Sequence, residues 1–149
     1  MIVLLDSGPL GLLSQPRGTA QAIECRSWLD GLVSKKIPVC VPEIADYEVR
    51  RELIRARKLE GLLIARLNWL KESLEYLPLT TSIMLLAAAY WAEARNRGKQ
   101  TAADSSLDAD MILAAQAKAF PPEEAVVIAT TNPGHLTMFT PALHWKEIL

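Results

Sequence analysis

The sequence predicts an α/β fold in which helices flank a central, mostly parallel sheet of 4–5 short strands. Four short apolar runs, typical of strands buried on both faces, alternate with longer segments of helical periodicity. This alternation indicates βα units joined by right-handed crossovers. A length of 149 residues favours a single domain, residues 1–149, and a hydrophobic content of 50% is enough for a core.

The first part of the chain supplies two predicted strands with a helix between them. The strand Ile2–Leu5 is an apolar run that ends at a carboxylate, Asp6. The helix Ala20–Ser34 repeats apolar residues at a rough helical period, and the strand Pro38–Val41 follows it. Cys40 lies between two valines of this strand, which favours a buried and unreactive thiol.

Two helices are expected after the second strand. The helix Pro42–Lys58 begins at once, because a proline is tolerated in the first helical turn. The helix Leu59–Leu74 continues it, with a break expected near Gly61.

The second part of the chain repeats the alternation. The strand Tyr76–Leu79 leads into the helix Ser82–Arg97, which has one apolar face and an expected C-cap at Gly98. The helix Asp108–Phe120 ends before a pair of prolines and precedes the strand Ala125–Ala129. Asp104 is expected in a polar, solvent-facing loop before that helix.

Composition narrows the class of protein. The net charge of −1 gives no overall attraction to nucleic acid, so any such partner would have to meet a local basic patch. Two cysteines without metal-ligand spacing exclude a disulfide scaffold and are consistent with a reducing compartment. The N-terminus does not resemble a signal peptide, and the longest apolar run, Ile83–Ala92, is too short to span a bilayer. We therefore expect a cytoplasmic protein without membrane contact.

Three acids fall where βα geometry can gather them. Asp6 ends the first strand, Glu48 lies in the helix after the second strand, and Asp110 lies in the first turn of a largely apolar helix. Ligands of open parallel sheets collect at the carboxyl ends of the strands. Each acid also has an ordinary alternative: a cap for Asp6, a solvated position for Glu48, and a helix-dipole contact for Asp110.

Four short motifs occur in order along the chain. They are the strand that ends in Asp-Ser at residues 6–7, Glu-apolar-x-x-x-Leu at 48–53, Asp-x-x-apolar-Ala-Ala at 110–115, and an apolar strand that runs into Thr-Thr-Asn at 130–132. Together they resemble the PIN-domain nuclease family, and within it the VapC-type toxin ribonucleases, over nearly the whole chain. The resemblance implies a single three-layer PIN-like domain. The sequence departs from the family at Asn132, where an acid is usual.

The resemblance implies a metal-dependent active site. Asp6, Glu48 and Asp110 would be the catalytic residues and the ligands of Mg²⁺ or Mn²⁺, ions that prefer hard oxygen ligands. Such ions polarise phosphoryl oxygens and lower the pKa of water. Asp108 is interpreted as a helix N-cap, an additional ligand, or both, and Asn132 as an auxiliary ligand without charge. The residues expected to contact substrate are Ser7, Arg50, Arg51, Thr131 and Asn132.

RNA binding requires positive charge. The richest local source is the helix that carries Glu48, with basic residues at positions 50, 51, 55, 57 and 58, partly offset by Glu52 and Glu60. This cluster could contact phosphates or could be an ordinary solvated helix face. Glu52 is expected to pair with a neighbouring arginine.

The leading hypothesis is a metal-dependent endoribonuclease, the toxin of a type II toxin-antitoxin pair. An antitoxin protein as partner and a homodimer are implied by the resemblance alone. The alternative is a PIN-like module that binds RNA or protein without cutting, which Asn132 favours. A haloacid-dehalogenase-type phosphatase would need an acid where Gly8 stands, and a response-regulator receiver would need an acidic pair at the first strand and a late lysine.

Overall fold

The sheet is parallel throughout. The computed structural model describes residues 1–15, 18–56, 61–97 and 104–149. Within these residues the strands are in the order β3-β2-β1-β4-β5, and every adjacent pair is parallel. Their bounds are β1 Ile2–Leu5, β2 Val39–Pro42, β3 Glu75–Leu77, β4 Val126–Thr130 and β5 Ala142–His144.

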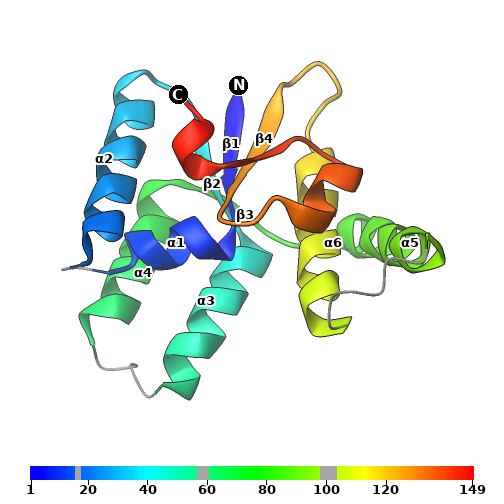
Figure 1. Cartoon of the computed structure of the whole chain (residues 1–149), viewed down its shortest axis with the longest axis horizontal. Coiled ribbons are helices and arrows are strands. Elements are labelled where there is room, and N and C mark those ends of the chain that lie inside the picture. Colours follow the sequence, from blue (N-terminus) through cyan, green and yellow to red (C-terminus); the bar gives the residue numbers. More distant parts are fainter. Residues whose placement is uncertain (16–17, 57–60, 98–103) are drawn as a thin grey trace.

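Helices cover both faces of the sheet (Figure 1). The helices α1 (Ser7–Leu13), α2 (Ala20–Ser34), α3 (Glu43–Arg55) and α4 (Leu62–Ser73) lie on one side. On the other side α6 (Asp104–Lys118) packs on the sheet, and α5 (Thr81–Asn96) packs outside α6. Two short 3-10 helices, η1 (Gly134–Met138) and η2 (Trp145–Glu147), flank β5. The predicted three-layer α/β fold is confirmed.

Alternating strand residues build the two cores. Val3 and Leu5 of β1 are fully buried in the cluster that joins α1 to α4, whereas Leu4 is fully buried in the cluster around α6. Cys40 of β2 lies on the same side as Leu4. Burial raises the pKa of the Cys40 thiol to about 12, with a further contribution from Glu75, which agrees with an unreactive side chain.

The sequence patterns missed one α-helix and one strand, α1 and β5, in addition to the two 3-10 helices. The helix α1 has the sequence SGPLGLL, whose glycines and proline are typical of a turn. It forms because Asp6 caps it and Pro9 lies in its first turn, where the missing backbone N–H would have no helical partner. The strand β5 has only three residues and lies at the edge of the sheet.

The start of α6 corrects one expectation. The helix begins at Asp104, not at Asp108, so the loop expected at Asp104 and the N-cap expected at Asp108 are both wrong. Asp108 and Asp110 therefore lie inside the helix. Lengthening the helix satisfies backbone hydrogen bonds that a polar loop would leave to water.

Helix ends elsewhere agree closely with the sequence. Gly61 precedes α4, as the expected break requires, and Pro42 is the N-cap of α3 and the last residue of β2. The expected C-cap Gly98 and the basic residues Arg57 and Lys58 lie outside the described residues. No described helix is long and apolar enough to cross a membrane.

Candidate active site

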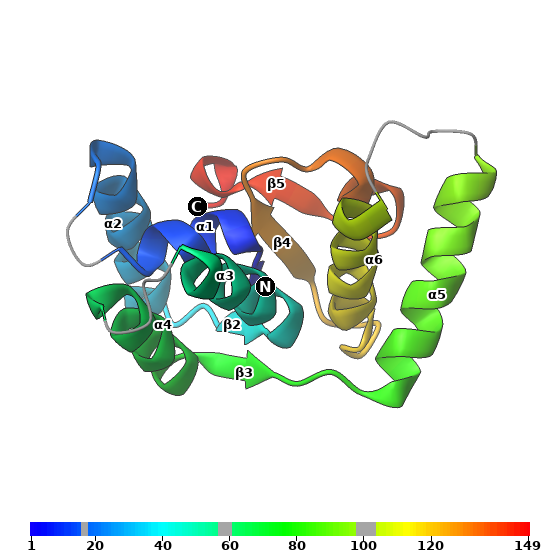
Figure 2. The same ribbon diagram turned by 90° about the horizontal axis from the view of Figure 1, so that it is seen from below.

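The carboxyl ends of β1 and β4 lie side by side. These strands pair in parallel, with Leu5 opposite Ala129, so that Asp6 and Thr130 emerge at the same edge of the sheet. Figure 2 looks onto this edge, with α1 and α3 on one side of it and α6 on the other. Three separate helices can therefore present side chains to one place.

Asp6 is fixed by two hydrogen bonds. The Ser7 backbone N–H donates to its Oδ1 at 2.7 Å, and the Thr130 hydroxyl donates to its Oδ2 at 2.7 Å. Asp6 therefore caps α1, which confirms the ordinary role, while its carboxylate is also anchored to β4. Because an ionised carboxylate accepts about four hydrogen bonds, both oxygens keep capacity for another ligand.

Glu48 projects from α3 toward Asp6 and is half-buried, with 20% of its side chain exposed. Burial raises its pKa to about 7, with additional repulsion from Asp6 and Asp110. The positive charge of Arg51 lowers the pKa of Glu48, and the Arg51 Nη2 lies 3.7 Å from the Glu48 Oε2. A glutamate on a solvated helix face would not feel these charges.

Asp110 completes the group from α6. Burial, and next the charge of Asp6, raise the pKa of Asp110 to about 7. Asp6, Glu48 and Asp110, hereafter the three acids, thus come from the ends or interiors of different elements and repel one another. The structure brings together the residues that the sequence singled out.

Gln116 sets how α6 lies against α3. Its Oε1 accepts from the Ile44 backbone N–H at 3.4 Å, and its Nε2 donates to the Leu77 carbonyl at 2.8 Å. Ile44 is one turn before Glu48, so this hydrogen bond joins the helix that carries Asp110 to the helix that carries Glu48. Sequence reasoning missed Gln116, although a polar residue in a largely apolar helix is a signal of such a contact.

Thr130 is the second residue that sequence reasoning missed. Besides donating to Asp6, its hydroxyl accepts from the Asn132 backbone N–H at 3.0 Å. It is 1% exposed at the last position of β4, so it ties the loop after the strand to the carboxylate. A hydroxyl at the end of a buried strand, inside the fourth motif, was the available signal.

The remaining polar residues of this edge have structural contacts of their own. Thr131 lies against Gly8, where an added Cβ would meet its Oγ1 at 2.6 Å, so the glycine lets α1 approach β4. The exposed Asn132 has its Oδ1 beside Gly134, which has a φ of +30°. Ser7 is half-buried at the start of α1 and uses its backbone N–H on Asp6.

Asp108 lies on a different side of α6. It is two residues, about 200° of helix rotation, from Asp110. It lines a cavity of about 400 Å³ between α5 and α6, together with Trp91 and Met84. The structure therefore places Asp108 away from the group that contains Asp110.

The arginines of α3 have different partners. Arg50 donates to both carboxylate oxygens of the buried Asp46, at 3.2 and 2.9 Å, and also to Asn68 of α4. Arg55 pairs with Glu52 at 2.8 Å, which confirms the surface pair expected for Glu52. Arg51 is the arginine of this helix that contacts one of the three acids.

The donor set has the chemistry that a divalent cation requires. Half-buried carboxylates whose charges repel one another gain most from a cation that neutralises the repulsion. Over the described residues, no group of three or more His, Cys, Asp or Glu side chains is arranged so that it could hold a metal ion as the side chains stand. Mg²⁺ keeps several waters and is usually bound by one or two carboxylates, so an open arrangement fits it.

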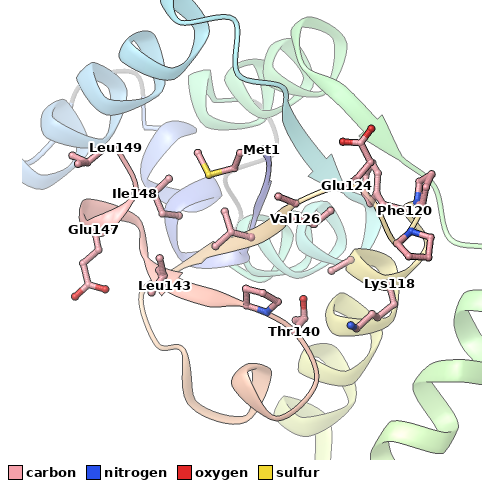
Figure 3. A pocket seen from close by; sticks show the side chains of 16 residues that line it. Met1, Lys118, Phe120, Glu124, Val126, Thr140, Leu143, Glu147, Ile148 and Leu149 are labelled. Carbon is pink, nitrogen blue, oxygen red and sulfur yellow. The ribbon is translucent and has the colours of Figure 1, made fainter.

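Two cavities differ in position and lining. A groove of about 440 Å³ between α1, α3 and α4 reaches Glu48 and Arg51 and includes Ser7. A larger cavity of about 630 Å³ lies at the amino edge of the sheet, beside Met1 and Val126 (Figure 3). Because the strands are parallel, this cavity is at the end of the sheet opposite Asp6.

The fold resembles that of chains in structures of VapBC proteins. A chain of VapBC2 from Rickettsia felis, bound to a DNA fragment from the promoter, matches with a TM-score of 0.71 and 14% sequence identity over 97% of this chain and 99% of that chain. A chain of DNA-bound VapBC from Salmonella typhimurium matches with a TM-score of 0.63 and 17% identity over 97% and 98% of the two chains. A chain of VapBC-1 from nontypeable Haemophilus influenzae matches with a TM-score of 0.63 and 16% identity over 99% and 100%.

No protein-family model and no curated protein matches the sequence. At identities of 14–17% the structural similarity establishes the fold, and it covers nearly the full length of each chain. The expectation of a PIN-like fold from the sequence motifs is therefore confirmed: the chain has the α/β fold found in these VapBC structures.

Proposed function

We propose that this protein is a metal-dependent endoribonuclease. The observation that carries the proposal is the mutual arrangement of the three acids, whose burial and repulsion raise the pKa values of Glu48 and Asp110 to about 7. Half-buried carboxylates that repel one another destabilise the folded protein when no cation is bound. A bound cation would neutralise this repulsion. Ionisable groups with strongly shifted pKa values are more typical of active sites than of residues that only stabilise the fold.

The side chains of the site would have separate roles. The three acids would hold Mg²⁺ or Mn²⁺, and the ion would supply charge neutralisation for the attacked phosphate and a lower pKa for the attacking water. Thr130 keeps the Asp6 carboxylate in place, and Gln116 keeps α3 and α6 at a fixed separation. Glu48 and Asp110 would release protons when the ion binds, because ligands must be ionised.

The proposal extends to partners. The structures with this fold are VapBC complexes, two of them with DNA, which supports an antitoxin partner and a toxin role in a type II pair for this chain. The groove that reaches Glu48 provides space for a strand of RNA beside Ser7 and Arg51. We extend the proposal to a homodimer, on the basis of the family resemblance, and to the cytoplasm, a reducing compartment with which the two free cysteines are consistent.

The second candidate is a PIN-like module that binds RNA or protein without cutting. Asn132 favours it, because an amide brings no charge to the site and its side chain lies over Gly134. The presence of the three acids, whose charges repel one another, favours the nuclease.

Cleavage of a mixed pool of structured RNAs with Mn²⁺ or Mg²⁺ tests the proposal. The unaltered protein should cut RNA, whereas Asp6→Asn and Asp110→Asn should not, and a chelator should stop the reaction. Glu124→Gln, at the opposite edge of the sheet, is the matched control because it also converts an exposed acid to its amide. Cutting that persists in both site variants would contradict the proposal.

Titration of Mn²⁺ into the same proteins separates the two candidates. A nuclease should bind the ion, and both site variants should bind it more weakly. If the folded protein binds RNA but neither binds the ion nor cuts any RNA of the pool, the non-catalytic module is the better description.

A further inference from the structure

An exposed aromatic residue is the sequence neighbour of Glu48, one of the three acids. Tyr47 directly precedes Glu48 on α3 and is 54% exposed. On the same helix Ile44 and Val49 are 5% and 8% exposed, whereas Tyr47 and, near the end of the helix, Ile54 (48%) remain in solvent. The ring is thus available to a ligand.

Arg51 joins this ring to the acids. Its guanidinium carbon lies 5.2 Å from the centroid of the Tyr47 ring, and its Nη2 lies 3.7 Å from the Glu48 Oε2. Residues four apart share one helix face, so Tyr47 and Arg51 lie one above the other. Two contacts hold the guanidinium between the ring and the acids, although 42% of the Arg51 side chain is exposed.

The other arginines of α3 have different tasks. Arg50 holds the buried Asp46 and Asn68, and Arg55 pairs with Glu52. Among the described side chains of this helix, Arg51 alone combines contact with an aromatic ring and contact with one of the three acids.

We propose that Tyr47 and Arg51 form a nucleotide subsite for single-stranded RNA, in which a base stacks on the Tyr47 ring and the guanidinium contacts the adjoining phosphate. This inference rests on the proposed ribonuclease function and adds to it the conformation of the substrate beside the cleaved bond. Aromatic rings stack with unpaired bases of any sequence, and arginine adds both charge and planarity. A paired base in a helix would offer no free face to the ring.

Equilibrium binding of a fluorescein-labelled 12-nucleotide single-stranded RNA tests the subsite. Tyr47→Ala should weaken binding by about 10-fold, whereas Tyr47→Phe, which keeps the ring, should bind like the unaltered protein. The matched control is Trp69→Ala: this ring is 51% exposed and has Arg66 at 4.4 Å, but that arginine donates to the Leu13 carbonyl. Circular dichroism should show that all variants remain folded.

Abasic RNA probes distinguish the loss of one stacking contact from a general loss of affinity. One base at a time is removed from the 12-nucleotide probe. In the unaltered protein one abasic position should weaken binding, and in Tyr47→Ala the same position should have no effect. Equal losses from Tyr47→Ala and Trp69→Ala, or an abasic penalty that is the same with and without the ring, would overturn the subsite.

Measurements of RNA binding and of RNA cleavage together distinguish failure of the proposed subsite from failure of the proposed ribonuclease function. If the protein cuts RNA but Tyr47→Ala binds the probe with unchanged affinity, the subsite is wrong and the nuclease remains. If binding depends on Tyr47 but no RNA is cut, the subsite remains and the nuclease is wrong. If the unaltered protein binds no single-stranded RNA, or if Tyr47→Ala loses only a protein partner, the subsite is wrong.

Discussion

At the carboxyl edge of the sheet, half-buried acids from different elements face one another, whereas at the amino edge apolar side chains surround a larger cavity. The amino-edge cavity of about 630 Å³ is lined by residues such as Met1, Val126 and Leu143 (Figure 3). The groove that reaches Glu48 has a volume of about 440 Å³. The position of charge, and not the size of a cavity, therefore locates the candidate site.

The parallel topology explains this difference. Every strand ends at the same edge, so the residues that follow Leu5 and Thr130 are brought together however far apart they are in sequence. At the amino edge, β5 is short and lies at the border of the sheet, which leaves apolar residues around it partly uncovered. The variants below test this contrast, from the largest expected effect to the smallest.

The strongest test removes the charge of Asp6. Asp6→Asn should reduce metal-dependent RNA cleavage by more than the roughly 100-fold that loss of an outer ligand partner can cause. The control at the amino edge, Glu124→Gln, should leave the rate unchanged. Initial rates with Mn²⁺ measure both, and comparable losses from the two variants would remove the contrast between the edges.

The hydroxyl that holds Asp6 should matter less than Asp6 itself. Thr130→Val removes the hydrogen bond of 2.7 Å to Oδ2, so cleavage should fall by about 10- to 100-fold. Thr130→Ser keeps a hydroxyl and should restore most of the rate. If valine and serine behave alike, the hydrogen bond does not position the carboxylate.

Two adjacent arginines at the carboxyl edge should differ in how much they stabilise the fold. Arg50→Ala leaves the buried Asp46 without its charged partner and should lower the free energy of unfolding by about 2 kcal/mol. Arg51→Ala breaks an exposed pair at 3.7 Å, so its effect on stability should stay below about 1 kcal/mol. Urea unfolding measures both values, and equal losses would contradict the different roles assigned here.

Repulsion among the three acids should appear as a pH-dependent stability. The pKa of Asp110 is raised from 3.8 to about 7 in the folded state, so between these values the folded state binds more protons than the unfolded state. Proton binding by Asp110 therefore favours the folded state at low pH, and this favourable contribution to the free energy of unfolding is lost as the pH rises toward 7. Without divalent cations, Asp110→Asn should raise the melting temperature at pH 8, by about 2–4 °C per kcal/mol gained, and have little effect near pH 4.

Magnesium provides the control for this pH effect. The ion should raise the melting temperature of the unaltered protein at pH 8 more than that of Asp110→Asn, because it binds the ionised acids of the folded state. A difference between the two proteins that does not change with pH would show that Asp110 acts through packing instead of charge.

The smallest effect is expected at the amino edge. Leu143 is 43% exposed beside the larger cavity, so Leu143→Ser should change stability by no more than about 0.5 kcal/mol. RNA cleavage by this variant should match that of the unaltered protein. A loss of cleavage would mean that the amino edge contributes to the site after all.

Local patterns were sufficient for most of the fold. Apolar runs and helical periods predicted β1, β2, β4 and most helices, because burial on one or two faces imposes a short repeat on the sequence. They failed at α1, where Gly8, Pro9 and Gly11 are typical of a turn, and at the start of α6. They also missed the three-residue strand β5, which is too short to show a repeat, whereas at the two helix starts a cap or a tertiary contact outweighs intrinsic preference.

The sequence by itself determined the α/β class, the order of most elements and the choice of the three acids as candidates, since these depend on local pattern and motif. Only the tertiary structure decided that Thr130 holds Asp6 across 124 residues of sequence, that Gln116 fixes α6 against α3, and that Arg50 and Arg51 differ in role. The physical reason is that hydrogen-bond partners, burial and charge proximity are properties of packing. They do not exist until distant segments of the chain meet.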